Sequence, residues 1–214
     1  MEFKKIHLNG FKSFAEKTDF FIETGLTGIV GPNGCGKTPV IHSIAYAMGY
    51  PVRFRDDILE HCDSVILRAH HRGRQITFER SIGSDFHIEL AIDNEDSQYF
   101  YNEKDIASFL FSALGLAPDA LTSVKNEPTS PYLSTFLPLF YVDQDSGYTS
   151  AYKSPNSFIK DQYTEMVRLA LGAPPKNSYE AKKHLIHKKK ELTSVDIEYC
   201  KHPPRNKRAS DDNL

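Results

Sequence analysis

The sequence is poor in cysteine and lacks long apolar runs, two features that would indicate a secreted or a membrane protein. Only three of its 214 residues are cysteines, an odd and widely spaced set, which argues against a disulfide framework and against a zinc knuckle. No apolar run approaches the length of a membrane span, and the first residues lack the apolar core of a signal peptide. We therefore expect a protein of the reducing cytoplasm, without a membrane partner.

An excess of charge of one sign is also missing. The chain has 26 Lys and Arg against 28 Asp and Glu, which gives a formal net charge of −2. Such a surface exerts no overall attraction on nucleic acid, so any binding of DNA would need a local basic patch. Its length and its 40% of apolar residues are sufficient for one well-buried core.

One glycine-rich stretch carries the clearest chemical signal in the chain. Residues 31–38 read Gly-Pro-Asn-Gly-Cys-Gly-Lys-Thr and fit the phosphate-binding pattern G-x-x-x-x-G-K-[ST]. Glycines let the backbone curl so that successive N–H groups converge on phosphate oxygens, and a helix N-terminus adds partial positive charge. Lys37 is expected to reach the β- and γ-phosphates of ATP, and the Thr38 hydroxyl to ligate Mg²⁺. The other loop residues expected to bind the nucleotide are Pro32, Asn33, Gly34, Cys35 and Gly36.

The segments on either side of this loop support the prediction. Residues 26–30 are apolar and β-branched, which predicts a buried strand, and residues 40–48 predict a helix with one apolar face that ends at Gly49. Strand, loop and helix thus follow one another in the order that a phosphate site needs. Pro39 is tolerated in the first turn of the helix, but it removes one N–H near the phosphates, which could weaken binding.

Short segments with a period of two predict a sheet that is largely antiparallel. Turn-forming residues separate the later segments at short intervals, which favours a meander over further β-α-β units. The predicted strands are residues 2–11, 18–22, 64–68, 75–79, 86–92 and 98–101.

The second half of the chain predicts helices and connecting segments. Residues 103–114 and 155–171 have the periodicity of amphipathic helices, and Asn102 can cap the first of them. Between them, the prolines and hydroxyl residues of 117–135 predict a surface loop, and the apolar run 136–142 predicts a buried strand.

The C-terminal part differs in composition from the rest. From residue 178 the sequence predicts a polar, lysine-rich helix, which could be the root of a coiled-coil arm, and the last residues have no core and predict disorder. The expected division is a lobe over 1–175, a helix over 176–198 and a tail over 199–214.

A second sequence motif, upstream of the phosphate loop, narrows the set of protein families that the loop could belong to. Residues 8–18 read Leu-Asn-Gly-Phe-Lys-Ser-Phe-Ala-Glu-Lys-Thr and precede the loop at 28–37. Together the two stretches resemble the N-terminus of SMC (structural maintenance of chromosomes) ATPases and of the related repair ATPases with coiled-coil arms. The resemblance is strong over residues 1–50 and weaker beyond.

This resemblance implies an α/β fold, a P-loop NTPase of the ABC and SMC head type with a mixed sheet. It implies that the chain is the N-terminal half of an ATPase head. In such proteins the C-terminal half supplies the signature motif, the second acidic motif and the catalytic glutamate. A second head would join through ATP, hydrolysis would release it, and duplex DNA would be bound without sequence preference. The process would be DNA tethering, repair or defence against foreign DNA, at the nucleoid in a bacterium or in the nucleus of a eukaryote.

The resemblance also suggests roles for residues outside the loop. Gln144, after the apolar run 136–142, would contact Mg²⁺ and the attacking water, and would act in catalysis with Lys37. A solvated glutamine in an acidic turn is the alternative. Arg53 or Arg55 would reach back to the nucleotide phosphates, as a forked and permanently charged group can. A solvated or ion-paired arginine is equally compatible with the sequence.

The dense basic run of the predicted C-terminal helix is the best candidate for contact with DNA. Such a run is by default a solvated helix face, but a DNA-bridging head needs residues that neutralise phosphates near the root of its arm. The residues are Lys182, Lys183, Lys188, Lys189 and Lys190.

Two other classes of protein remain open. One is a self-contained P-loop kinase or GTPase-like switch, and the other is a non-catalytic nucleotide-binding fragment with a regulatory role. Against the first, we find no convincing second acidic motif, no base-reading motif and no arginine-rich lid. A reading frame that continues into a long heptad region would favour the SMC-like interpretation.

Overall fold

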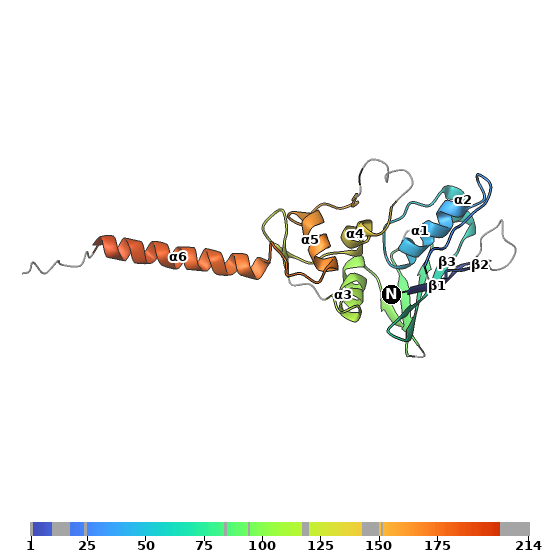
Figure 1. The fold of residues 1–214 in the computed structure, drawn as a ribbon, viewed down its shortest axis with the longest axis horizontal. Coiled ribbons are helices and arrows are strands. Elements are labelled where there is room, and N and C mark those ends of the chain that lie inside the picture. The colour runs from blue at the N-terminus through green and yellow to red at the C-terminus, as the bar shows by residue number, and fades with distance from the viewer. Residues whose placement is uncertain are drawn as a thin grey trace, which may run out of the picture.

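The computed structural model describes residues 2–9, 18–23, 25–83, 85–93, 95–116, 120–142, 150 and 152–201. These residues form an α/β body with a sheet at one end, several helices beside it and one long helix that projects away from the rest (Figure 1).

The main sheet is antiparallel between all of its neighbours. It has six strands in the order β2-β1-β3-β4-β5-β6, so the last four form a meander in chain order, as predicted. No strand that the structure describes in this sheet pairs in parallel, so the parallel part of the expected mixed sheet is not seen in this chain. The strands are β1 (Glu2–Asn9), β2 (Thr18–Phe21), β3 (Ser64–His71), β4 (Arg74–Ser81), β5 (Ile88–Ile92) and β6 (Gln98–Phe100).

The helices and the small second sheet follow in chain order. Asn102 caps α3 as predicted, because its side chain accepts a hydrogen bond from the Asp105 amide at 2.9 Å. Gly49 follows α1 with a φ of +107°, which confirms the predicted glycine end of that helix. The elements are α1 (Lys37–Ala47), α2 (Asp56–His61), α3 (Glu103–Ala113), β7 (Leu121–Thr122), β8 (Pro128–Thr129), α4 (Leu133–Phe136), the 3₁₀ helix η1 (Leu137–Leu139), α5 (Gln162–Ala170) and α6 (Tyr179–Lys201).

One face of the sheet carries the core. Alternate residues of β3, β4 and β5 are buried, since side chains on a strand point to opposite faces in turn. They form one apolar cluster with residues of α1 and α3, which places both helices on the same face of the sheet. Its members include Val40, Val65, Leu67, Phe78, Ile88, Leu90, Ile106 and Phe111.

The predicted strand at residues 26–30 is not formed. The segment has no regular structure, and the side chains of Leu26 and Val30 are 98% and 95% exposed. Its sequence suits a buried strand, but a strand needs a neighbour to complete its hydrogen bonds. No described segment of this chain offers that neighbour.

The predicted strand at residues 136–142 is also wrong. These residues continue from α4 into η1, and Pro138 stands in the first turn of η1. Proline has no N–H to give to a sheet, and Tyr132 and Thr135 form a capping box that starts a helix here. Phe136 and Pro138 are buried on these helical turns, whereas Phe140 and Val142 are 67% and 63% exposed, so the predicted burial holds only for the first part of the segment.

Two further boundaries differ from the prediction. The helix expected from residue 155 begins only at Gln162, because Asp161 has a φ of +52° and Ile159 pairs with Ser123 as an isolated β-bridge. The predicted surface loop at 117–135 contains the β7–β8 hairpin, and Leu121 and Leu133 are buried. The hydroxyl residues and prolines of this segment correctly predicted turns, but they gave no indication that Leu121 and Leu133 are buried.

The long helix α6 lies apart from the body of the protein (Figure 1). It runs from Tyr179 to Lys201, so it contains residues 179–198 of the helix expected over 176–198 and also the first three residues of the tail expected over 199–214. Residues 202–214 lie outside the described residues, and the division into domains stays a prediction. Within the described part of the chain, no helix combines the length and apolar character needed to cross a membrane.

Candidate nucleotide-binding site

The phosphate loop has a geometry that depends on its glycines. Gly34 and Gly36 have φ values of +82° and +92°, a region that residues with a Cβ rarely adopt. A Cβ on Gly31 would lie 2.7 Å from the Cys35 sulfur, so a side chain there would force the Cys35 side chain to move. The three glycines therefore fit the curled backbone that the motif predicts.

Lys37 lies at the start of α1 and turns back over the loop. Its Nζ donates to the carbonyl oxygen of Gly31 at 2.7 Å and to that of Pro32 at 2.6 Å. The ammonium charge is thus held on the loop itself, at the positive end of a helix dipole. The first turn of α1 contains no Asp or Glu that would compete with an anion.

The residues after Lys37 complete the first turn of the helix. Thr38 is half-buried, and the ladder of α1 begins with the Val40 amide, which donates to the Gly36 carbonyl at 3.4 Å. Pro39 lies between them without an N–H, and its carbonyl accepts from the Ser43 hydroxyl at 2.7 Å. The turn therefore forms despite the proline, and the effect of Pro39 on nucleotide affinity stays a prediction.

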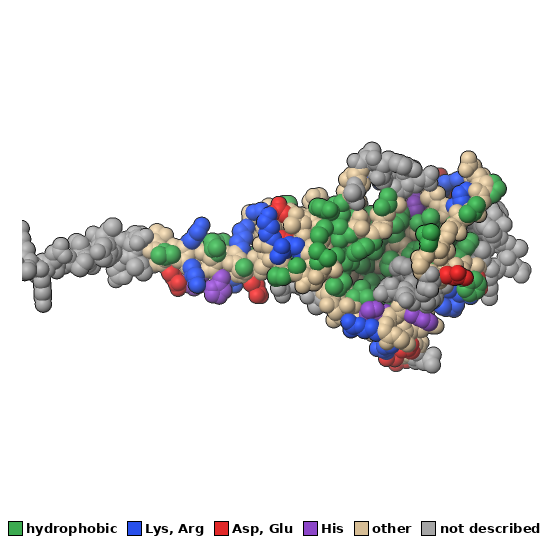
Figure 2. Space-filling view, viewed as in Figure 1, with side chains coloured by type: hydrophobic (Ala, Val, Ile, Leu, Met, Phe, Trp, Pro, Cys, Tyr) green, Lys and Arg blue, Asp and Glu red, His purple; other side chains and the backbone are tan. Residues whose placement is uncertain are grey.

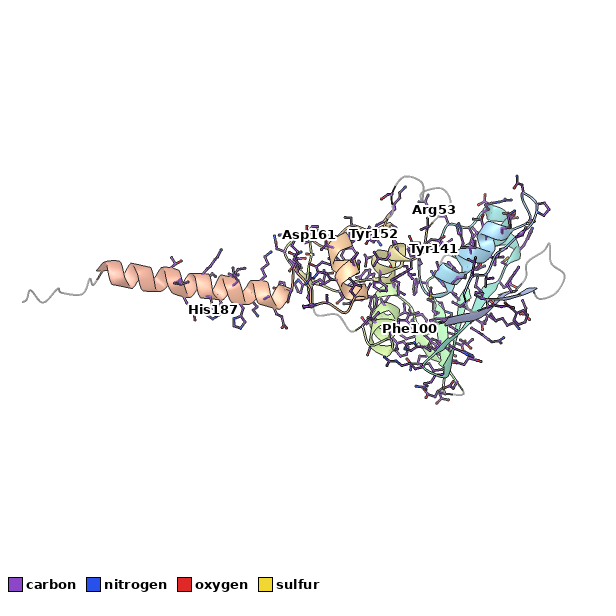
Figure 3. All side chains as sticks on the ribbon, viewed as in Figure 1. Arg53, Phe100, Tyr141, Tyr152, Asp161 and His187 are labelled. Carbon is purple, nitrogen blue, oxygen red and sulfur yellow. The ribbon has the colours of Figure 1, made fainter. Side chains whose placement is uncertain are left out.

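Gln144 lies outside the described residues, but the chain just before it is held against α1. The ring of Tyr141 contacts the rings of His42 and Tyr50, at centroid distances of 6.1 and 5.4 Å (Figure 3). Tyr141 was not among the predicted site residues, and its aromatic side chain near the end of the apolar run 136–142 was the only signal for this contact in the sequence. Its contacts bring the segment that leads to Gln144 beside the phosphate-loop helix.

The two candidate arginines differ in their surroundings. Arg55 forms a two-pronged ion pair with Asp57, with its Nε 3.0 Å from one carboxylate oxygen and its Nη2 2.8 Å from the other. Arg53 is exposed and has no hydrogen bond or ion pair within the described ranges (Figure 3). A phosphate would therefore have to displace a carboxylate from Arg55 but not from Arg53, and the role of either arginine stays a prediction.

The lysines proposed for DNA lie on α6, a helix that carries charges of both signs. Lys182 is half-buried and donates to the side-chain oxygen of Asn126, so it is already engaged with the head. Blue lysines alternate with acidic side chains and histidines along this helix (Figure 2), and His187 lies 3.6 Å from Glu191. The exposed members of the set are Lys183, Lys188, Lys189 and Lys190.

No resident metal centre is built into the described part of the chain, where no group of three or more His, Cys, Asp or Glu residues could hold an ion. Mg²⁺ usually takes only one or two protein ligands and completes its shell with water and nucleotide phosphates. The Thr38 hydroxyl at the loop, together with a nucleotide, fits that pattern.

The family follows from a comparison with known sequences. The model of the RecF/RecN/SMC N terminal domain matches residues 2–112, which is more than half of the chain and includes the phosphate loop, α1 and the whole main sheet. The chain belongs to this family. Membership confirms the resemblance drawn from the first 50 residues and assigns the chain to the N-terminal region of an SMC-like ATPase head. For this family, binding of ATP and Mg²⁺ is the general expectation.

Individual relatives match a shorter segment. The chain is 57% identical over 49 residues to the Chromosome partition protein Smc of Rhodopseudomonas palustris, an alignment that covers 23% of this chain and 4% of the relative. It is 35% identical over 96 residues to the protein of the same name from Delftia acidovorans, which covers 45% of this chain and 8% of the relative. The aligned part is thus a small fraction of the length of these relatives.

Proposed function

We propose that this chain is the ATP-binding N-terminal half of an SMC-like ATPase head that acts on DNA. The observation that carries the proposal is the phosphate loop, with two left-handed glycines and the Lys37 ammonium turned over it at the start of α1. It stands in a member of the RecF/RecN/SMC family, in the region that the family model covers.

The exposed segment that leads into the loop supports the half-head. Leu26 and Val30 are almost fully exposed, although their sequence suits a buried strand. Apolar side chains gathered at a surface mark a site that another surface covers. The C-terminal half of the same protein fits this place, because strands from it would pair with residues 26–30 and cover their side chains.

A larger apolar surface supports the same partner. Figure 2 shows hydrophobic side chains gathered over the middle of the molecule, near α4 and α5, where Phe140, Tyr163 and Leu171 are more than half exposed. The C-terminal half, or the second head of an ATP-bridged dimer, would bury this surface.

The proposed chemistry uses few groups of this chain. Lys37 would leave its two carbonyl partners to bind the β- and γ-phosphate oxygens. The Thr38 hydroxyl would help to hold Mg²⁺, which would supply charge neutralisation at the phosphates. Gln144 would orient the attacking water. The catalytic glutamate comes from the C-terminal half, so hydrolysis needs the completed head.

DNA is the proposed substrate of the whole assembly. The relatives named above are chromosome partition proteins, and for this chain we propose a role in DNA tethering, repair or defence, close to the chromosome. The exposed lysines of α6 would contact the phosphate backbone of a duplex, which implies binding without sequence preference.

The test is nucleotide binding by the Lys37→Ala variant. The change removes the charge at the β- and γ-phosphates from an exposed loop, so we expect Mg·ATP binding to be lost in calorimetry while thermal unfolding stays unchanged. Lys125→Ala, at the exposed tip of the β7–β8 hairpin, is the matched control and should bind as the wild type does. Equal affinity of Lys37→Ala and the wild type would overturn the assignment.

ATP hydrolysis by the same two proteins, the wild type and Lys37→Ala, distinguishes a half-head from a self-contained enzyme. A half-head binds ATP but turns it over negligibly without its C-terminal partner. Steady hydrolysis by the isolated wild-type chain, lost in Lys37→Ala, would instead favour the kinase or GTPase-like alternative.

A further inference from the structure

A buried arginine lies behind the phosphate-loop helix. Arg80, on β4, is 7% exposed, and its Nη1 donates to the carbonyl oxygens of Tyr46 at 2.7 Å and Tyr50 at 3.2 Å. Tyr46 is in the last turn of α1 and Tyr50 follows its end. The guanidinium therefore caps the C-terminal end of the helix whose N-terminal end carries Lys37.

Aromatic rings enclose the same guanidinium. Its central carbon lies 3.8 Å from the ring centroid of Tyr46 and 4.5 Å from that of Phe86. The Tyr46 hydroxyl in turn donates to the Ser81 carbonyl at 2.7 Å, so Tyr46 is tied to β4 at both its ring and its backbone. Arg80 thus connects the end of α1 to the sheet through three kinds of contact: hydrogen bonds, ring stacking and packing.

Burying this cation is costly for the fold. Burial lowers the pKa of Arg80, while the neighbouring Tyr46 and Glu103 oppose that shift, and its Nε has no hydrogen-bond partner among the described residues. No carboxylate forms an ion pair with it in the same part of the chain. The cost of burying the charge is offset here by hydrogen bonds to two carbonyl groups and by two aromatic rings, and not by a carboxylate.

The carbonyls that it binds lie at the negative end of the α1 dipole. The Gly49 amide donates to the Tyr46 carbonyl at 2.9 Å and the Tyr50 amide to the Ala45 carbonyl at 3.0 Å, the pattern of a Schellman end. Arg80 adds a cation to this terminus, where a positive charge is favourable. At the opposite end of α1, the loop residues 32–35 that precede the helix are exposed.

We infer that Arg80 is a positioning residue for the phosphate loop. By fixing the C-terminal end of α1 to β4, it sets the axis of an 11-residue helix and with it the direction of the first-turn amides and of Lys37. The inference rests on the proposed nucleotide-binding function and names a residue that acts through the helix without touching the nucleotide.

Three variants test it by Mg·ATP affinity. Arg80→Met keeps much of the volume but removes the charge and donors, and we expect affinity to fall by roughly fivefold to tenfold. Arg80→Lys restores a cation that can donate to the same carbonyls, so part of the affinity should return. Arg74→Met is the matched control, because Arg74 lies at the exposed end of the same strand and pairs with Asp93 at 3.0 Å. It should bind as the wild type does.

Hydrogen exchange without nucleotide provides the second measurement. We expect Arg80→Met to accelerate exchange along α1 as far as residues 37–42, beyond the turn that Arg80 touches. Faster exchange confined to residues 45–50, with affinity unchanged, would overturn the inference and leave Arg80 a structural cap. If the wild type binds no ATP, the proposed function fails, and the exchange pattern still decides for or against Arg80. If Arg80→Met does not fold, Arg80→Gln takes its place under the same criteria.

Discussion

Two cysteines of this protein have opposite surroundings. Cys35 is exposed in the phosphate loop, whereas Cys62, which follows α2, is 4% exposed and its amide donates to the Ile58 carbonyl. Burial, followed by the nearby charges of Asp63 and Asp57, raises the pKa of Cys62 from 9.0 to about 11. The thiolate is the reactive form, so the two residues should react very differently.

At pH 8, iodoacetamide should modify Cys35 rapidly and Cys62 only when the protein unfolds. We would measure this by peptide mass spectrometry in a Cys200→Ser background, so that only these two thiols remain. Cys35→Ser is the control and should leave no fast reaction. Modification of Cys62 at the rate of Cys35 in the native protein would contradict its burial.

The same pKa gives a pH dependence of stability. Because the folded state holds the Cys62 proton up to a pKa of about 11, against 9.0 in the unfolded chain, its stabilising contribution is complete below pH 9. It is lost as the pH rises from 9 to about 11, and Cys62→Ala should show a smaller loss of stability over that window.

At the scale of the elements, a buried carboxylate joins α5 to the start of α6. Glu165 is 1% exposed and accepts hydrogen bonds from the amides of Lys176 at 3.1 Å and Asn177 at 2.7 Å, and from the Asn177 side chain at 2.9 Å. From the other side, the amide and hydroxyl of Thr122 donate to the Asn177 carbonyl at 3.0 and 2.8 Å. The residues before α6 are therefore held from two directions.

Glu165→Ala should destabilise the protein by about 2–4 kcal/mol, because it removes the buried acceptor of three partly buried donors. Urea unfolding would measure the change, with an unchanged slope as evidence that the transition stays two-state. Glu180→Ala, an exposed position on α6, is the matched control and should change stability by less than about 0.5 kcal/mol. A loss no larger than that of the control would show that the contact does not hold the junction.

The sequence predicted correctly those elements that are determined by residues close together in the chain. The period of two identified β3 to β6, and the capping residues Asn102 and Gly49 located helix ends, since these signals act within a few residues. They failed at residues 26–30, where the strand lacks a neighbour, and at 136–142, where Pro138 removes a donor. Of the candidate site, the phosphate loop was predictable because its motif is contiguous.

Contacts between distant segments left weaker signals. Arg80 stands in the inward register of β4, after Ile76 and Phe78, so its burial could have been inferred from the alternation. Nothing in the sequence connects Glu165 with Asn177, because the pair depends on how two helices meet. Such contacts require the folded chain.

At the scale of the whole molecule, charge is distributed unevenly along the long axis. The net charge is −2, yet α6 carries exposed lysines well away from the body (Figure 1). Under the proposed function we expect the exposed lysines of α6 to contact DNA, and Glu180 and Glu191 on the same helix to keep that attraction modest.

Replacement of Lys188, Lys189 and Lys190 by Glu should weaken binding of duplex DNA. Each phosphate contact releases counterions, so wild-type binding should be independent of sequence, weak, and steeply reduced by salt. Fluorescence anisotropy at two salt concentrations would measure both effects. The control is a second triple variant with the same change in charge. In it, Glu replaces three lysines that are exposed on the body, Lys104, Lys125 and Lys160. If the two triple variants bind alike, or if salt has no effect, α6 is only a solvated surface.

The firm attachment of α6 also has a mechanical consequence. With 23 residues at about 1.5 Å each, the helix is a lever roughly 34 Å long whose pivot is the junction at Asn177. A tilt of about 10° at the pivot would displace its far end by roughly 6 Å, from simple geometry at that rise per residue. The hydrogen bonds of Glu165 and Thr122 set the stiffness of this junction. A stiff junction would transmit a small rotation of the body into a displacement of the far end of α6, whereas a soft junction would bend instead.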